Sequence, residues 1–152
     1  MRISELINSE RDLARLSTFI RENEHLLPDP LSLHVDTDAY CFKLLSLGRV
    51  FVAEEGDEIC GVMMGYINDF AGHIAHMQVL IVNGRFQGRG LGKKLVLHFL
   101  AEAGKAGMKE AELTCDASNE KAASLYRKIG FLPSPVVHPN KEKRYFVYEI
   151  HD

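Results

Sequence analysis

One stretch decides the fold of this chain: Leu80-Ile-Val-Asn-Gly-Arg-Phe-Gln87-Gly88-Arg89-Gly90-Leu91-Gly92-Lys93-Lys94-Leu95. It begins with β-prone apolar residues, which Asn83 and Gly84 bring to an end. Glycine then recurs at every second position from 88 to 92, and Leu91, Leu95 and Phe99 follow four residues apart, as on one face of a helix. The sequence therefore predicts a strand, a turn, a glycine-rich loop and a helix, in that order.

This order predicts an anion-binding loop. The first turn of a helix leaves backbone N–H groups unpaired and carries the positive end of the helix dipole, and glycines let a ligand approach the backbone. Phosphate or pyrophosphate suits such a loop best. A P-loop would need glycine and Ser/Thr where this chain has Gln87 and Lys94, and the G-x-G-x-x-G spacing is not met either. Four basic residues surround the loop: Arg85, Arg89, Lys93 and Lys94.

The loop fits a different pattern, Gln/Arg-x-x-Gly-x-Gly/Ala, as Gln87-Gly88-Arg89-Gly90-Leu91-Gly92. A second block follows: Leu113-Thr-Cys-Asp-Ala-Ser-Asn119-Glu-Lys-Ala-Ala-Ser-Leu-Tyr126-Arg-Lys-Ile-Gly130-Phe131. In this order and spacing the two blocks resemble the acetyl-CoA-binding motif and the downstream motif of the GNAT acetyltransferase superfamily. The resemblance covers residues 74 to 131, and the flanking segments match only in general layout.

The composition is that of one soluble globular domain, residues 1–152, with 46% hydrophobic and 26% charged residues. A formal net charge of −3 argues against nucleic-acid binding. No apolar run reaches the ~20 residues of a membrane span, and the first residues do not read as a signal peptide. Cys41, Cys60 and Cys115 form no C-x-x-C pair, which predicts free thiols in a reducing cytoplasm.

Apolar periodicity and turn residues predict the order βααβββ and then αβαβ, which ends in the final strand. With the GNAT resemblance, the expected fold class is α/β (α+β): a mixed, mostly antiparallel twisted sheet with a splayed parallel pair at its centre and helices on both faces. The segment 23–35 is expected to be a loop whose leucines pack on the core. The alternative is that this loop forms a wall of the pocket that binds the acceptor amine. The expected strands are 2–5, 49–54, 59–68, 74–82, 110–115 and 145–150; the helices begin at Ser9 or Asp12, Asp36 or Thr37, Gly90, and Asp116 or Ser118.

The resemblance implies that acetyl-CoA binds as co-substrate. Its pyrophosphate would lie on the N–H groups of residues 88–93, and its pantetheine arm would pair with the strand at 80–82. Asn119 resembles the family's contact to the cofactor arm; its alternative role is to satisfy local backbone groups. No metal site is predicted. The cofactor-binding set is Leu80, Ile81, Val82, Gln87, Gly88, Arg89, Gly90, Leu91, Gly92, Lys93, Asn119 and Tyr126.

Two side chains are predicted to move protons. Tyr126 matches the family's general acid, and a phenol of ordinary pKa near 10 stays protonated at neutral pH; the alternative is a core tyrosine. Relatives that acetylate protein N-termini carry a glutamate where this chain has Thr114, which is no base. Alternation along 74–82 places His76, Gln78 and Leu80 on one face, so His76 is the candidate base. A hydrogen-bonded strand histidine is the alternative reading, and Glu54 or a water chain is the fallback base.

The function implied is N-acetylation of a primary amine of a small molecule, by direct attack on acetyl-CoA in a ternary complex. A peptide or protein acceptor, or a non-catalytic acyl-CoA-binding module, are the alternatives. The sequence leaves open the acceptor, the acyl-chain preference and the oligomeric state, with a homodimer as one option.

Overall fold

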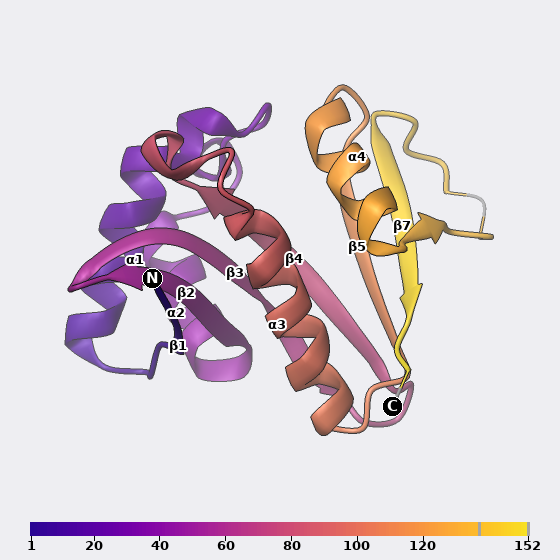
Figure 1. The fold of residues 1–152 in the computed structure, drawn as a ribbon, viewed down its shortest axis with the longest axis horizontal. Helices are drawn as coiled ribbons and strands as arrows, with labels where there is room; N and C mark the ends of the chain where they lie inside the picture. The colour runs from indigo at the N-terminus through magenta and orange to yellow at the C-terminus, as the bar shows by residue number, and fades with distance from the viewer. Residues whose placement is uncertain (137, 152) are drawn as a thin grey trace.

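The computed structural model describes residues 1–136 and 138–151, in which seven strands form one sheet in the order β1-β2-β3-β4-β5-β7-β6 (Figure 1). In this part of the chain, no helix has the length and apolarity that a bilayer crossing needs. The strands are β1 (Arg2–Glu5), β2 (Arg49–Glu55), β3 (Glu58–Asp69), β4 (Ile74–Val82), β5 (Glu110–Asp116), β6 (Leu132–Pro133) and β7 (Lys143–Glu149); the helices are α1 (Glu10–Asn23), α2 (Thr37–Leu47), α3 (Leu91–Lys105) and α4 (Glu120–Ile129), with short 3-10 turns η1 (Glu24–Leu26), η2 (Leu31–Leu33) and η3 (Gly84–Phe86).

The sheet has one core on each face. Leucines and Phe99 of α3 pack with Ala123 and Tyr126 of α4 on one face. On the other face, apolar residues of α1 and α2 pack against β2, β3 and the end of β4. Only β4 and β5 are parallel among the paired strands of the described chain, because α3 crosses over between them. The expected fold class is confirmed.

The strands β4 and β5 separate along their length. Their ladder runs from Ile74–Glu110 to Met77–Leu113 and stops there, while β5 stays paired with β7 as far as Asp116. Residues 78–82 therefore have no ladder partner on the β5 side, and α4 and β7 diverge from β4 with β5 (Figure 1). The splayed parallel pair expected from the sequence is confirmed.

A β-bulge in β4 contradicts the alternation predicted for this strand. Val79 pairs with Met64, but Met77 pairs with the next residue, Gly65, so Gln78 is an extra residue in the ladder. An inserted residue reverses the faces that follow it. Met77 and Leu80 consequently share the core beneath α3, and His76, next to Met77 in the strand, lies on the face opposite to Leu80. The prediction that His76 and Leu80 share a face is wrong.

The helix caps agree with the sequence at two helices and differ at α4. Ser9 caps α1, and Asp36 caps α2 by accepting the N–H of Ala39 at 2.9 Å. The cap of α4 is Asn119, and not Asp116 or Ser118, because the Asp116 carboxylate instead accepts the N–H of Ser118 at 2.9 Å in a local turn that ends β5. The two-residue strand β6 was not predicted, since it is too short to show a period.

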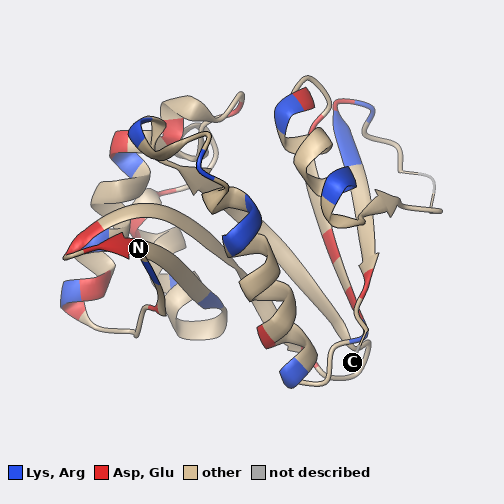
Figure 2. Cartoon of the chain, in the orientation of Figure 1, with Lys and Arg blue, Asp and Glu red and all other residues tan. Residues whose placement is uncertain are grey.

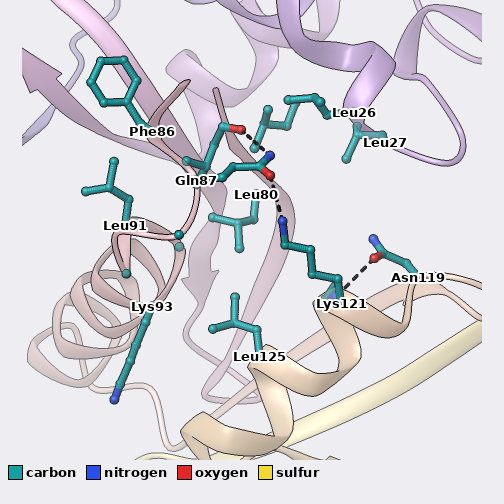
Figure 3. A pocket seen from close by; sticks show the side chains of 16 residues that line it. Leu26, Leu27, Leu80, Phe86, Gln87, Leu91, Lys93, Asn119, Lys121 and Leu125 are labelled. Carbon is teal, nitrogen blue, oxygen red and sulfur yellow. Dashed lines mark hydrogen bonds between the residues drawn. The ribbon is translucent and has the colours of Figure 1, made fainter. Parts of the chain in front are cut away.

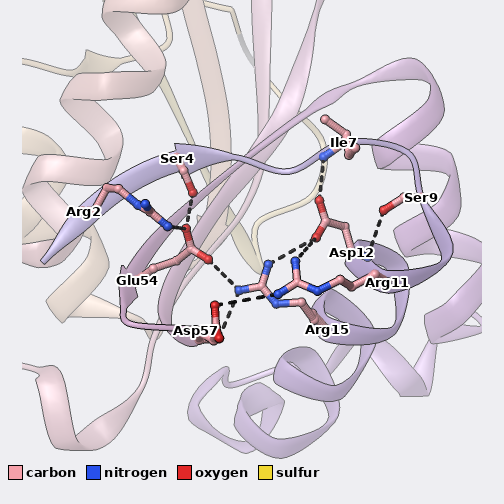
Figure 4. A network of polar contacts seen from close by, with 9 residues as sticks. All are labelled: Arg2, Ser4, Ile7, Ser9, Arg11, Asp12, Arg15, Glu54 and Asp57. Carbon is pink, nitrogen blue, oxygen red and sulfur yellow. Dashed lines mark hydrogen bonds and ion pairs between the residues drawn. The ribbon is translucent and has the colours of Figure 1, made fainter.

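Glu54, the fallback base, is engaged far from the splayed strands. Its buried carboxylate accepts hydrogen bonds from Ser4, from Arg15 at 2.5 Å and from Arg2 at 3.3 Å (Figure 4). Burial alone would raise the pKa of Glu54, but these hydrogen bonds and the charge of Arg15 outweigh burial and hold the pKa below its usual range. The carboxylate therefore joins β1, β2 and α1 and is a weak proton acceptor.

Replacing Glu54 with Gln is expected to lower the free energy of unfolding by about 2 kcal/mol, the scale of hydrogen bonds to a charged group. Because the folded-state pKa is lowered, this stabilisation is complete above the unfolded pKa and is lost as pH falls through the folded value. In denaturant titrations between pH 7 and pH 3, the free energy of unfolding of Glu54→Gln should therefore fall less on acidification than that of the wild-type protein. Glu55→Gln, at the exposed end of the same strand, is the control. Equal pH curves for both variants would contradict the assignment.

Candidate functional site

A pocket of about 280 Å³ lies between the diverging halves of the sheet (Figure 3). The end of β4, the loop after it and the start of α3 form one wall, and α4 forms the opposite wall. Leu26 and Leu27, next to each other at the end of η1, contribute a third side. The lining contains ten of the predicted cofactor-binding residues: Leu80, Ile81, Val82, Gln87, Gly88, Gly90, Leu91, Gly92, Lys93 and Asn119.

The glycine-rich loop presents a row of free amide groups to this pocket. The first hydrogen bond of α3 runs from the N–H of Lys94 to the carbonyl of Gly90, at 3.1 Å. The backbone N–H groups of residues 88–93 have no acceptor among the described residues. Their position at the head of a 15-residue helix adds the positive end of its dipole. Unpaired donors with this field fit a diphosphate group.

Three glycines are needed in this loop for two different reasons. Gly88 and Gly90 have φ of +79° and +76°, although a methyl group at either position would meet no atom within 4 Å. Their backbone conformation, and not a lack of space, requires glycine. A methyl group on Gly92 would lie 3.3 Å from Leu125 Cδ2, so this glycine lets α3 approach α4 closely.

Arg89 is one of two predicted contacts that lie outside the lining, the other being Tyr126. Its guanidinium is 5.2 Å from the centre of the Phe86 ring, and that of Arg85 is 5.1 Å from the same buried ring. Arg85 also pairs with Glu58 on β3. Figure 2 shows the basic residues along this loop and the first turns of α3. Arg85 and Arg89 therefore brace the loop over Phe86 and add positive charge near the free amides.

Lys121 is a pocket residue that sequence reasoning missed. Its ammonium group donates to Gln87 Oε1 at 2.8 Å, and Gln87 Nε2 donates to the carbonyl of Val82 at 3.1 Å (Figure 3). This chain of hydrogen bonds joins α4 to the end of β4 across the pocket. The four-residue spacing of Lys121 and Leu125 in the second motif is a signal that could have placed both on the face of α4 that lines the pocket.

Asn119 has the structural role weighed for it, and its contact to the cofactor arm stays a prediction. Its side-chain oxygen accepts the N–H of Ala122 at 3.1 Å and so caps α4. The side-chain NH₂ group has no partner in the described part of the chain, and the residue lines the pocket. One atom of this amide is therefore structural, while the other remains available as a donor to a ligand.

Tyr126 lies in the core beside the diverging strands β4 and β5, and it does not line the first pocket. Only 7% of it is exposed, and its ring packs at 5.6 Å from Phe131 and 6.2 Å from Phe146. Burial, with a smaller effect of the nearby Cys115, raises the pKa of this phenol above its ordinary value. The hydroxyl is thus held protonated at neutral pH. It lies near Cys115, in the part of β5 beyond its last pair with β4.

A second pocket, of about 190 Å³, lies where β4 and β5 begin to separate. Glu112 and Thr114 alternate with Leu113, which packs in the core beneath α3, so their side chains lie on the opposite face of β5. The second pocket is lined by Met77, Gln78, Glu112, Leu113, Thr114, Ser134, His138, Tyr145, Phe146 and Val147.

His76 borders this second pocket without lining it. Its Nδ1 is 2.9 Å from Glu112 Oε1, and its Nε2 is 3.6 Å from Asp69 Oδ2. Neither pocket has His76 in its described lining. Within the described residues, no group of three or more His, Cys, Asp or Glu side chains is arranged to hold a metal ion.

The loop between α1 and α2 was expected either to pack on the core or to form a wall of the acceptor pocket. Leu27 and Leu31 pack against the core beneath α1 and α2, as expected of a structural loop. Leu26 and Leu27 also line the first pocket, so this link is a wall of the site predicted for acetyl-CoA and not of the second pocket.

Residues 14–131 match the Acetyltransferase (GNAT) family. A region of 87 residues is 37% identical to the mycothiol acetyltransferase of Renibacterium salmoninarum and covers 55% of this chain and 26% of that protein. A region of 113 residues is 30% identical to the uncharacterized N-acetyltransferase YvbK of Bacillus subtilis (strain 168), covering 74% of this chain and 68% of YvbK. The chain thus spans about a quarter of the first relative and about two thirds of the second.

Solved structures share the fold. An aminoglycoside 6'-acetyltransferase type Ii superposes with a TM-score of 0.82 at 18% identity, covering 100% of this chain and 99% of that chain. The PaiA N-acetyltransferase from Thermoplasma acidophilum, solved in complex with coenzyme A, has a TM-score of 0.75 at 18% identity, with 98% and 99% covered. At these identities the likeness concerns the fold alone.

Proposed function

Because the chain belongs to the GNAT acetyltransferase family, we propose that it transfers the acetyl group of acetyl-CoA to a primary amine of a small molecule. The family makes it an acyltransferase. The observation that carries the proposal is the row of free amides at residues 88–93, which faces Asn119 and Lys121 across one pocket. A diphosphate and an extended polar arm have the charge and shape that these walls suit.

The proposed binding roles follow from the free groups in the pocket. The amides of residues 88–93 would hold the pyrophosphate, and the edge of β4 at 80–82, which has no partner on the β5 side, would pair with the pantetheine arm. Asn119 would donate its NH₂ group to the same arm. The ammonium group of Lys121, which donates to Gln87, would add positive charge near the pyrophosphate of acetyl-CoA.

The proposed chemistry needs no covalent enzyme intermediate. The amine nitrogen forms a bond to the acetyl carbon in a ternary complex, and the carbon–sulfur bond breaks. The neutral amine loses one proton, which passes through water to His76, and the departing thiolate gains one from Tyr126, which recovers its proton from solvent. A backbone N–H near Leu80 would stabilise the oxyanion. The name of one similar protein, which refers to mycothiol, supports a small-molecule acceptor.

Thiol release from acetyl-CoA, measured across polyamines, amino sugars, amino acids and peptides, tests this function. We expect turnover with at least one small amine and the N-acetylated product by mass spectrometry. Turnover with peptides alone would contradict the small-molecule acceptor and indicate a peptide or protein acceptor. Tight acetyl-CoA binding without turnover on any amine would favour a non-catalytic acyl-CoA-binding module.

His76 remains the proposed final proton acceptor, acting through water because it lies outside both linings. If so, kcat/KM should rise with pH through a limb that disappears in His76→Gln, with slower turnover that high pH partly restores. The pH profile should be repeated with an acceptor amine of different pKa, because a limb that moves with the acceptor belongs to the substrate. An unchanged limb in His76→Gln would remove this role.

A further inference from the structure

We propose that Glu112 makes the second pocket selective for acceptors that carry a second positive charge, namely small diamines and polyamines. The inference rests on the proposed acetylation of an amine and specifies the class of acceptor. One amine would lie where β4 and β5 separate, and the other would be bound by the Glu112 carboxylate.

The charge of the second pocket is one-sided. Glu112 is the carboxylate of its described lining, which contains no lysine or arginine. Figure 2 shows acidic residues along this part of β5 and at the end of β7, where Glu110 pairs with Glu149 in the ladder. An acceptor with a carboxylate or phosphate would meet this charge without a lysine or arginine partner in the described lining, whereas an ammonium group would gain a charge-assisted hydrogen bond.

The Glu112 carboxylate is held in place and keeps free acceptor capacity. His76 Nδ1 lies 2.9 Å from Oε1 of Glu112, and an ionised carboxylate has about four acceptor sites, which is more than one such contact can fill. The Glu112 side chain is 46% exposed, so a ligand can reach it from the pocket. The neighbouring wall is aromatic, because the His138 ring stacks on Tyr145 at 3.6 Å and offers a flat surface to a methylene chain.

The dimensions of the pocket suit a short diamine. Glu112 is two residues before Thr114, which lies just beyond the last β4–β5 pair, and two residues of a strand span ~6.6 Å. This separation is comparable with the distance between the nitrogens of a 1,4- or 1,5-diamine. A volume of about 190 Å³ corresponds to that of ~6 water molecules, which is similar to the size of such a chain.

Three acceptors of matched length test the proposal: 1,4-diaminobutane, butylamine and 4-aminobutanoate. We expect kcat/KM for the diamine to exceed that for butylamine by about tenfold, the effect of one partly exposed charged hydrogen bond, with 4-aminobutanoate poorest. Glu112→Gln should bring the ratio of diamine to butylamine close to one. Glu110→Gln, the same change on the same strand outside the lining, should leave the ratio unaltered.

Calorimetry separates failure of this inference from failure of the proposed function. If no amine is acetylated, the proposed function fails, but titration of the CoA-bound protein with 1,4-diaminobutane and butylamine still reports the preference and its loss in Glu112→Gln. Thermal melts confirm that the variant is folded. Equal kcat/KM and equal affinity for the two amines in the wild-type protein, or a preference that survives in Glu112→Gln, would overturn the proposal.

Discussion

Replacing Tyr126 with phenylalanine is expected to lower kcat by ~100- to 10,000-fold, the usual effect of losing a general acid. The variant keeps the ring that packs against Phe131 and Phe146 and removes only the hydroxyl. Burial raises the pKa of this phenol, so the proton that the thiolate requires is present throughout the neutral range. Affinity for acetyl-CoA and the melting temperature should change little, because Tyr126 does not line the pocket.

Tyr148→Phe is the matched control. Tyr148 packs against the same Phe131 ring, at 5.1 Å, but it lies on β7 and is not a predicted proton donor. It should retain wild-type kcat. If Tyr126→Phe also turns over at the wild-type rate, Tyr126 is a core residue and another group protonates the thiolate. Parallel losses in both variants would indicate a packing effect on α4.

Gly90→Glu is expected to weaken acetyl-CoA binding by at least ~100-fold while the fold survives. The new carboxylate would stand among the free amides of residues 88–93, where the pyrophosphate is proposed to bind. Backbone crowding is not the cause, because a Cβ atom at Gly90 would meet no atom within 4 Å. Isothermal calorimetry with acetyl-CoA, together with a melting curve, measures the effect.

Two controls separate charge from backbone strain. Gly90→Ala retains the unfavourable positive φ without the charge, so it should cost about 1–2 kcal/mol of stability and less affinity than Gly90→Glu. Gly84→Glu introduces the same charge into open space six residues earlier, outside the lining. Unchanged acetyl-CoA affinity in a folded Gly90→Glu protein would remove the phosphate-binding assignment of this loop.

Much of the first pocket could be predicted because its signals are local. The alternation of glycines at 88–92 and the helical spacing after Leu91 place free amides at the head of α3 whatever the rest of the chain does. Asn119 was found for a similar reason, since it lies in the second motif and at a helix start. The chain of hydrogen bonds from Lys121 through Gln87 to Val82 was missed, because it joins three segments that only the packed structure brings together.

By itself, then, the sequence predicted the order of the helices and of every strand except β6, and the free amides before α3. It also singled out Asn119 and Tyr126, whose roles stay predictions. Tertiary structure decided which face His76 occupies, because the bulge at Gln78 arises from the register between β4 and β3 and leaves no mark on the alternation of β4 itself. It also decided the contact between His76 and Glu112 and the second pocket beside it. These features depend on pairing between strands that lie far apart in the chain, and local side-chain patterns carry no record of that pairing.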